Sequence, residues 1–279
     1  MIGRSARICL FVDCDMATTS NSDIEKGSAG HLNETANGSR PPVQLTPEQY
    51  EKLFLQPGGR APQGTFALRF GNPTPLPILG YLLCLTPTAC YLMQWGGADS
   101  TSMVTLCGPF YFVGGLTMVV GGVMEWILGN TFPFVVFVVF GTFWLALGVT
   151  NDPMHNITAA YNSTGGAASV AYNNGVMFYF IFWALTVAIF CVGALRTNLV
   201  FVGIFFTLIF TFAFLAAGYG FVANGNLSYA NTMLKAAGAW AFANVAIAWY
   251  LFSALILASV DMPFSLPVGD LSGFLKRRD

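Results

Sequence analysis

Glu125 is the one carboxylate that lies inside a long apolar run of this sequence rather than beside one. A charged side chain at the centre of a bilayer costs at least about 2.5 to 3.5 kcal/mol, so its position calls for a reason. One interpretation is depth, because Glu125 and Trp126 lie near the end of their run, where the side chain could reach lipid headgroups. The other is a protonatable group or selectivity element on a transport route. The residues alone leave both open.

Side chains that carry enzymatic chemistry are scarce. The chain has two histidines, His31 and His155, both outside the apolar runs, and no glycine-rich nucleotide loop. Its six cysteines show no spacing typical of a zinc site or a disulfide framework: Cys9, Cys14, Cys84, Cys90, Cys107 and Cys191. No basic stripe interleaved with aromatic residues indicates nucleic-acid binding. We therefore expect no enzyme, no cofactor, no metal site and no nucleic-acid partner.

The segment Asn72-Pro73-Thr74-Pro75 is suited to start a helix, with Asn72 as the N-cap and Pro73 in the first turn. A helix N-terminus attracts a small anion through its free N–H groups and its dipole. A strong helix start explains the same residues without any ligand, and the segment by itself favours that simpler interpretation.

The elements that must position these residues are transmembrane helices. Of 279 residues, 55% are hydrophobic and 9% charged, against roughly 25% charged in a typical soluble domain. Six apolar stretches approach or exceed the roughly 20 residues that span a bilayer: 75–95, 104–128, 131–150, 175–195, 199–222 and 236–260. We predict an all-α integral membrane fold, a six-helix bundle over 72–262. Residues 1–71 are predicted to form a mostly disordered cytosolic tail, and residues 263–279 a cytosolic C-terminal tail.

The distribution of basic residues predicts the orientation. With the N-terminus inside, eleven of the 12 Lys and Arg residues fall in inner segments, and Lys235 is the exception. The sequons at Asn156, Asn162 and Asn226 fall in loops that this topology places outside, so we expect these to be the glycosylation candidates. Both signals give the same topology, with both termini in the cytosol.

Small residues indicate where helices approach closely. Gly114, Gly115, Gly121 and Gly122 form two pairs seven residues apart, nearly on one helix face, which favours helix packing over solute contact. Gly129-Asn130 predicts a tight turn between antiparallel helices. Asn244, Thr207 and Thr211 fit either a polar path or interhelical hydrogen bonds.

Several motifs together resemble the acetate uptake transporter family, also called the GPR1/FUN34/YaaH family. Residues 72–77, Asn-Pro-Thr-Pro-Leu-Pro, resemble its N-P-A/G-P-L-G signature. Residues 125–132 are similar to its E-x-x-x-G-N-T-F turn, and residues 140–145 to its S-Y-G-x-F-W-L/I stretch. Ala248-Trp249-Tyr250 and residues 266–270, Leu-Pro-Val-Gly-Asp, resemble the fungal branch.

The resemblance implies a plasma-membrane transporter or channel for small monocarboxylates, with acetate first and propionate or succinate as further substrates. It also implies proton linkage and a homohexamer in which each protomer has its own route. The carboxylate would bind at Asn72, Pro73, Thr74, Pro75 and Leu76. A narrow apolar constriction would be formed by Tyr81, Phe140 and Leu208. Independently of the resemblance, its place in an apolar run makes Glu125 the candidate for proton coupling or selectivity.

This chain departs from the family pattern at three positions. Pro77 stands where the family has glycine, Met118 where a glutamine is usual, and Phe140 where the family has a tyrosine. The last change removes a hydroxyl from the constriction, which Tyr81 could restore from the first helix. These departures keep two alternatives open: a membrane sensor or signalling protein that does not transport, and an exporter of ammonium or ammonia.

Overall fold

Six long apolar helices make up the membrane part of the chain. The computed structural model describes residues 70–271, so the predicted tail over 1–71 lies almost wholly outside the described residues, as does the end of the chain after 271. The spans are α2 (Pro75–Leu92), the helical segment Thr101–Ile127 that ends in α4 (Thr117–Ile127), α5 (Thr131–Asn151), α6 (Val170–Ala194), α7 (Leu199–Ala223) and α8 (Leu227–Ser259). The prediction of an all-α fold with six candidate spans is confirmed.

Two helices begin a full turn or more before the residue that the hydropathy pattern predicts. The last span was expected from residue 236, but α8 begins at Leu227, because the Asn226 side chain accepts a hydrogen bond from the Tyr229 N–H and caps the helix. Lys235 therefore lies within α8 and not before it. Similarly, α6 begins at Val170 rather than 175. In both cases the extra turns are more polar than the span they extend, which is why hydropathy missed them.

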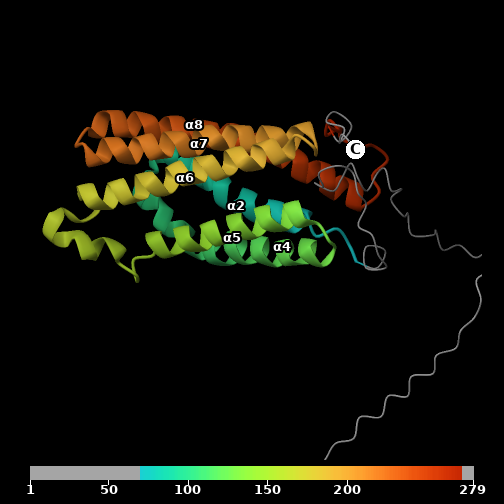
Figure 1. Ribbon diagram of the computed structural model, residues 1–279, viewed down its shortest axis with the longest axis horizontal. Coiled ribbons are helices and arrows are strands. Elements are labelled where there is room, and N and C mark those ends of the chain that lie inside the picture. Colours follow the sequence, from blue (N-terminus) through green and yellow to red (C-terminus); the bar gives the residue numbers. More distant parts are fainter. Residues whose placement is uncertain (1–69, 272–279) are drawn as a thin grey trace, which may run out of the picture. The chain divides into compact units, whose positions relative to one another are not determined.

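The helices run antiparallel, so their connections gather at two ends of the bundle (Figure 1). The short turns between α4 and α5 and between α6 and α7 lie at one end, called here the turn end, together with the start of α2. The opposite loop end holds the α5–α6 connection with its 3-10 helices η4 (Ile157–Thr164) and η5 (Gly166–Ala168). Asn156, Asn162 and Asn226 all lie at the loop end and are exposed.

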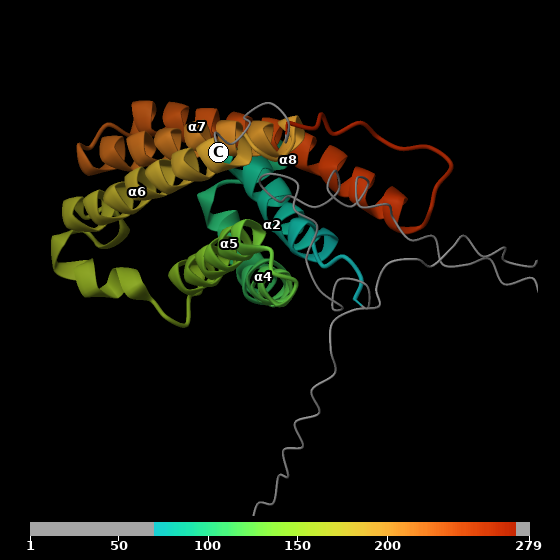
Figure 2. The same ribbon diagram turned by 45° about the vertical axis from the view of Figure 1, so that its right-hand side comes forward.

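Helix α2 lies between two groups of helices. Figure 2 shows α7 and α8 on one side of α2 and α4 and α5 on the other, and α2 contacts both α8 and α4. Half of its span is buried, against 17% for α6. A stripe of apolar side chains on α6 is exposed instead, at Phe178, Phe182, Leu185, Ile189 and Val192. These recur every three or four residues, which is typical of a helix face turned to lipid.

The second span is irregular where it meets α2. It passes from the 3-10 helix η2 (Ser100–Leu106) through α3 (Cys107–Pro109) into a π-helical segment, η3 (Phe110–Leu116), before α4 begins. Two of its glycines face the first helix. A Cβ on Gly114 would lie 2.8 Å from the Cys84 Sγ, and one on Gly121 would lie 2.6 Å from the Pro77 Cδ. The prediction that these small residues serve packing is confirmed.

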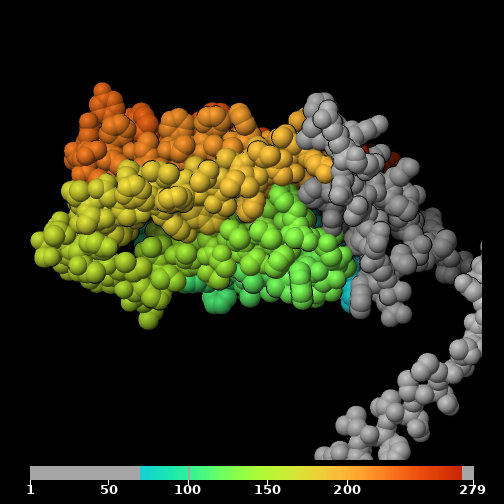
Figure 3. Space-filling model, viewed as in Figure 1, coloured from blue at the N-terminus to red at the C-terminus, as the bar shows by residue number. Residues whose placement is uncertain are grey.

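Large aromatic side chains join α5 and α6. Phe143 packs edge-on against Trp183 with ring centroids 4.8 Å apart, and Phe132 packs against Phe190 at 6.2 Å. In the space-filling view the side chains of α6 and α5 meet along the length of the face shown (Figure 3). The many phenylalanines therefore let these two helices stand apart while the space between them is filled.

Candidate functional site

A small apolar cavity lies between the helices toward the turn end. This turn-side cavity of about 40 Å³ is lined by residues of α2, α4, α5, α7 and α8, among them Ile78, Met118, Phe137, Phe205 and Leu251. Apart from Tyr81, every side chain in its wall is apolar. It is large enough to hold a water molecule, but the wall offers few hydrogen-bond partners.

A second cavity follows toward the loop end. This loop-side cavity, of about 90 Å³, extends to Asn151 at the end of α5 and to Tyr219 on α7. The two cavities share three lining residues, Tyr81, Phe140 and Leu208. These are the residues predicted to form the constriction, and the structure places them together between the two spaces. All three are buried, at 8%, 4% and 3% exposure. We call them the neck.

The neck tyrosine is held by a polar network that crosses three helices. The Tyr81 hydroxyl of α2 donates a hydrogen bond of 2.5 Å to the Asn244 Oδ1 of α8. The Asn244 amide in turn donates to the Ile204 carbonyl at 2.6 Å and to the Thr207 Oγ1 at 2.9 Å, both on α7. Asn244 and Thr207 thus form an interhelical hydrogen bond, one of the two interpretations that the sequence left open. The ring of Tyr81 meets Phe140 edge-on at 6.4 Å.

Glu125 is completely buried and lies against the start of α2. Its Oε1 accepts a hydrogen bond from the Thr74 hydroxyl and its Oε2 accepts one from the Asn130 amide, each at 2.5 Å. The interpretation that this side chain reaches lipid headgroups is therefore wrong. The Glu125 side chain joins the 72–77 motif to the α4–α5 turn through these two hydrogen bonds. It is not among the lining residues of either cavity.

The start of α2 differs from the sequence prediction. The helix begins at Pro75, with Thr74 and not Asn72 in the N-cap position. The Asn72 Oδ1 accepts from the Thr74 N–H at 3.0 Å, which forms a turn before the helix. The Thr74 side chain accepts no cap hydrogen bond, and its hydroxyl donates to Glu125.

Four of the five predicted carboxylate-binding residues line a separate groove. Asn72, Pro73, Pro75 and Leu76 face a space of about 650 Å³ at the turn end, which they share with the ends of α4 and α8, and Thr74 is not in its wall. The groove shares no lining residue with the turn-side cavity. The structure therefore unites the three neck residues but does not bring the motif residues to them.

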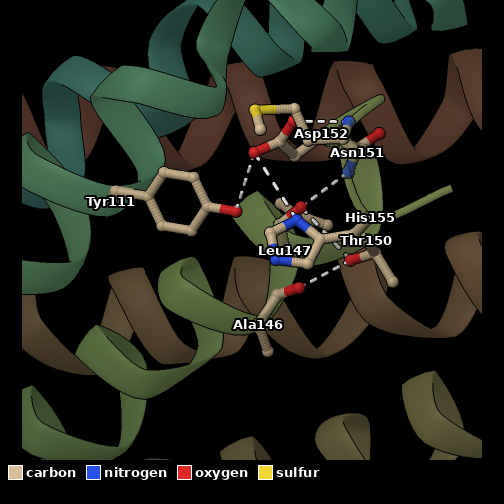
Figure 4. A network of polar contacts seen from close by, with 8 residues as sticks. Tyr111, Ala146, Leu147, Thr150, Asn151, Asp152 and His155 are labelled. Atoms are coloured by element: carbon tan, nitrogen blue, oxygen red, sulfur yellow. Dashed lines mark hydrogen bonds and ion pairs between the residues drawn. The ribbon is translucent and has the colours of Figure 1, made fainter. Parts of the chain in front are cut away.

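Polar side chains form a network at the C-terminal end of α5 (Figure 4). Asp152 accepts a hydrogen bond from the Tyr111 hydroxyl at 3.3 Å, and its Oδ2 lies 3.5 Å from the His155 Nδ1. The neighbouring Asn151, which lines the loop-side cavity, donates to the Leu147 carbonyl at 2.8 Å. This network fixes the end of α5 where it leaves the bundle.

Comparison with known protein families identifies the family of this chain. The model of the GPR1/FUN34/yaaH family matches residues 54–273. The chain belongs to this family. The matched range includes the segments 72–77, 125–132 and 140–145, and the family is one of membrane transporters and channels, not of enzymes.

Several named proteins are similar to this chain over most of their length. The protein alcS of Aspergillus fumigatus is 39% identical over 271 residues, covering 92% of this chain and 99% of alcS. The acetate transporter protein patA of Penicillium expansum is 32% identical over 209 residues, covering 75% of this chain and 81% of patA. The solved structure of the bacterial acetate channel SatP has the same fold, with a TM-score of 0.57 at 23% identity, and covers 72% of this chain and 99% of SatP.

The structure shows what surrounds two of the three positions at which this chain departs from the family pattern. Met118 is buried in the wall of the turn-side cavity, so the change from glutamine makes that wall more apolar. Pro77 packs directly on Gly121 of α4. Other cavity residues escaped sequence reasoning, although helix periodicity would have found them: Ile78, Phe137 and Ile204 lie three or four residues before the neck residues of their helices.

Proposed function

We propose that this protein carries short monocarboxylic acids across a membrane, with acetate as the first candidate. The observation that carries the proposal is the pair of cavities that meet at Tyr81, Phe140 and Leu208. Relatives named as an acetate transporter and an acetate permease, 32% and 30% identical, indicate the substrate class. Propionate and succinate are further candidates for the same route.

An apolar neck favours a neutral or partly dehydrated acid over a hydrated ion, because a charge without a partner is costly in low dielectric. A simple carboxylic acid titrates in the range of a glutamic acid side chain, near pH 4.3. Acidic conditions therefore raise the fraction that can enter, and we propose that transport is linked to a proton carried on the acid. A coupling or selectivity role for Glu125 stays a prediction. Its side chain accepts a hydrogen bond from Thr74 and does not line either cavity.

The orientation we propose places the turn end in the cytosol and the loop end outside the cell, in the plasma membrane. Eleven of the 12 Lys and Arg residues lie in the sequence before α2, in the sequence after residue 271 or at Arg196 between α6 and α7, and this distribution supports it. Exposed sequons at Asn156, Asn162 and Asn226 support the loop end as the outer one. A glycosidase-sensitive mobility shift that disappears stepwise in Asn→Gln variants of these sites tests the orientation.

We also propose that the protein assembles as a homohexamer. The carboxylate would be received at the cytosolic mouth by Asn72, Pro73, Thr74, Pro75 and Leu76.

Uptake of labelled acetate in a transporter-deficient cell that expresses this chain tests the function. We expect uptake above background that increases as the external pH falls from 7 to 5. The double variant Tyr81→Ala, Phe140→Ala changes the neck and should alter the size selectivity. Uptake at background level at acidic pH, with the protein present in the membrane, would exclude acetate transport.

Ammonia is a second candidate solute. Ammonia transport outward protein 2 of Saccharomyces cerevisiae is 28% identical over 207 residues, covering 72% of this chain and 69% of that protein. An apolar neck passes neutral ammonia on the same physical grounds as a neutral acid. Efflux of labelled methylamine from the same cells separates the two. If the protein is instead a sensor that does not transport, acetate uptake and methylamine efflux both stay at background, while a growth phenotype still depends on the chain.

A further inference from the structure

The chain turns back after α8 and pairs with the start of α7. Figure 2 shows it leaving the end of α8 and returning toward the start of α7. The Leu199 N–H donates a hydrogen bond to the Gly269 carbonyl at 2.7 Å. The Val200 N–H donates to the Val268 carbonyl at 3.4 Å. We call residues 266–271 the C-terminal strap. They include the Leu-Pro-Val-Gly-Asp motif, which the proposed function leaves without a role.

The C-terminal strap completes the cap of α7. The first N–H groups of a helix have no hydrogen-bond partner inside the helix. In α7 the Asn198 Oδ1 accepts from the Phe201 N–H at 2.8 Å. The strap accepts from the two residues before it, Leu199 and Val200. These groups in the first turn of α7 are therefore all paired only while the strap is in place.

The same first turn carries Phe201, which lines the turn-side cavity and is 3% exposed. Its ring packs edge-on against Phe205 with centroids 4.7 Å apart, and against Phe132 of α5 at 6.1 Å. Because α7 begins at the turn end, Phe201 is the cavity residue of α7 nearest that end. On the side of α7, its ring therefore closes the cavity toward the turn end.

The C-terminal strap also contacts α8. The Tyr250 hydroxyl donates to the Pro267 carbonyl at 2.7 Å. Two residues next to Tyr250 along α8, Ala248 and Leu251, line the turn-side cavity. The strap thus joins two helices of the cavity wall near the turn end.

The C-terminal strap is held less firmly than the helices it joins. Pro267 and Gly269 are exposed, and Val268 packs against the hydrophobic core. A further backbone contact runs from the Leu271 N–H to the Thr197 carbonyl at 3.0 Å. Segments with few buried apolar contacts and exposed backbone hydrogen bonds open at a lower free energy than packed helices. The strap can therefore leave α7 while the helices stay folded.

We propose that the C-terminal strap is a latch that holds Phe201 closed over the turn-side cavity, and that its release opens the cavity toward the turn end. The neck keeps its structure in both states. The strap then sets how often the cavity is open, whereas the neck decides which solute passes. This inference adds a gate to the proposed function, and its first test does not depend on transport.

Gly269→Ala should release the strap. Gly269 has a φ of +68°, which alanine rarely adopts, and an added Cβ would lie 2.9 Å from the Leu199 Cβ. The measurement is the rate at which a small thiol reagent labels Ile204→Cys in purified protein whose natural cysteines are replaced by alanine. Ile204 lines the turn-side cavity and is 6% exposed. Loss of two backbone hydrogen bonds corresponds to about tenfold or more in the equilibrium between closed and open states, so the labelling rate should rise about tenfold.

Two controls separate release of the latch from general loosening. Gly225→Ala imposes similar backbone strain at a φ of +73°, but it lies between α7 and α8 and an added Cβ would have no neighbour within 4 Å. We expect it to leave the labelling of Ile204→Cys unchanged. Thr211→Cys reports on the loop-side cavity, beyond the neck, and Thr211 is 3% exposed. Its labelling should stay the same in Gly269→Ala.

Tyr250→Phe is a second way to loosen the strap and changes no backbone. It removes the hydrogen bond to the Pro267 carbonyl, so the labelling of Ile204→Cys should rise about two- to tenfold. In liposomes, Gly269→Ala and Tyr250→Phe should both increase the maximal rate of acetate flux and leave the ratio of butyrate to acetate uptake unchanged, because the neck is intact.

The two failures are distinguishable. Unchanged labelling of Ile204→Cys in both strap variants, an equal rise in Gly225→Ala, an equal rise at Thr211→Cys, or an unchanged maximal flux would overturn this inference and leave the proposed function intact. Absence of acetate uptake by the wild-type protein would overturn the proposed function, whereas a labelling rise confined to Ile204→Cys would still support the latch.

Discussion

The Tyr81 hydroxyl donates to the Asn244 Oδ1 at 2.5 Å, and this contact ties the neck on α2 to the opposite helix α8. Because the Asn244 amide also donates to α7, one side chain fixes the positions of three helices around the neck. The hydroxyl is thus a means of holding the neck, and its hydrogen is not available to a solute.

Tyr81→Phe should therefore destabilise the protein while leaving the neck almost as narrow. The buried Asn244 oxygen loses its donor, which costs about 1 to 3 kcal/mol, so we expect a lower thermal unfolding temperature for the purified protein. Tyr91→Phe is the control, because Tyr91 also lies on α2 but its hydroxyl makes an exposed contact of 3.3 Å with Thr105. Equal unfolding temperatures for the wild-type protein and Tyr81→Phe would show that the buried contact contributes nothing.

Leu208→Ala should widen the neck and change which acids pass. One methylene in an apolar pocket is worth about 1 to 3 kcal/mol of discrimination, so the ratio of butyrate to acetate uptake should rise about tenfold or more. Phe206→Ala, on an exposed face of the same helix, should leave the ratio unchanged. An unchanged ratio in Leu208→Ala would remove Leu208 from the selecting residues.

Gly121→Ala should destabilise the contact between α2 and α4, because the new Cβ would lie 2.6 Å from the rigid Pro77 ring. Overpacking of this kind costs about 1 to 3 kcal/mol. Gly175→Ala is the matched control, since a Cβ added there would have no neighbouring atom within 4 Å. The double variant Gly121→Ala, Pro77→Gly should recover part of the loss in unfolding temperature. Additive losses would contradict the proposed clash.

Glu125→Gln should loosen the junction between the 72–77 motif and the α4–α5 turn. The carboxylate accepts from both Thr74 and Asn130, whereas a glutamine presents an NH2 group to one of these donors. We expect a lower unfolding temperature and, if the proton travels on the acid as proposed, an unchanged dependence of acetate uptake on pH. Loss of the pH dependence in a folded Glu125→Gln variant would instead assign proton coupling to this residue.

Hydropathy was enough to predict six spans, because each span depends on a stretch of one helix. The family resemblance named Tyr81, Phe140 and Leu208, and the structure brings these three residues together. The contacts that hold the neck residues in place could not be predicted from the sequence. Tyr81 and Asn244 are 163 residues apart, and a single sequence does not say that α2 lies beside α8.

Acetate flux into liposomes that contain purified protein tests the central claim most directly, with the neck closed by Leu208→Trp. The account predicts pH-dependent uptake by the wild-type protein, uptake near that of protein-free liposomes for Leu208→Trp, and normal uptake for Phe206→Trp on the exposed face of α7. Wild-type flux in a folded Leu208→Trp variant would contradict it, because the acid would then cross by a path that does not include the neck.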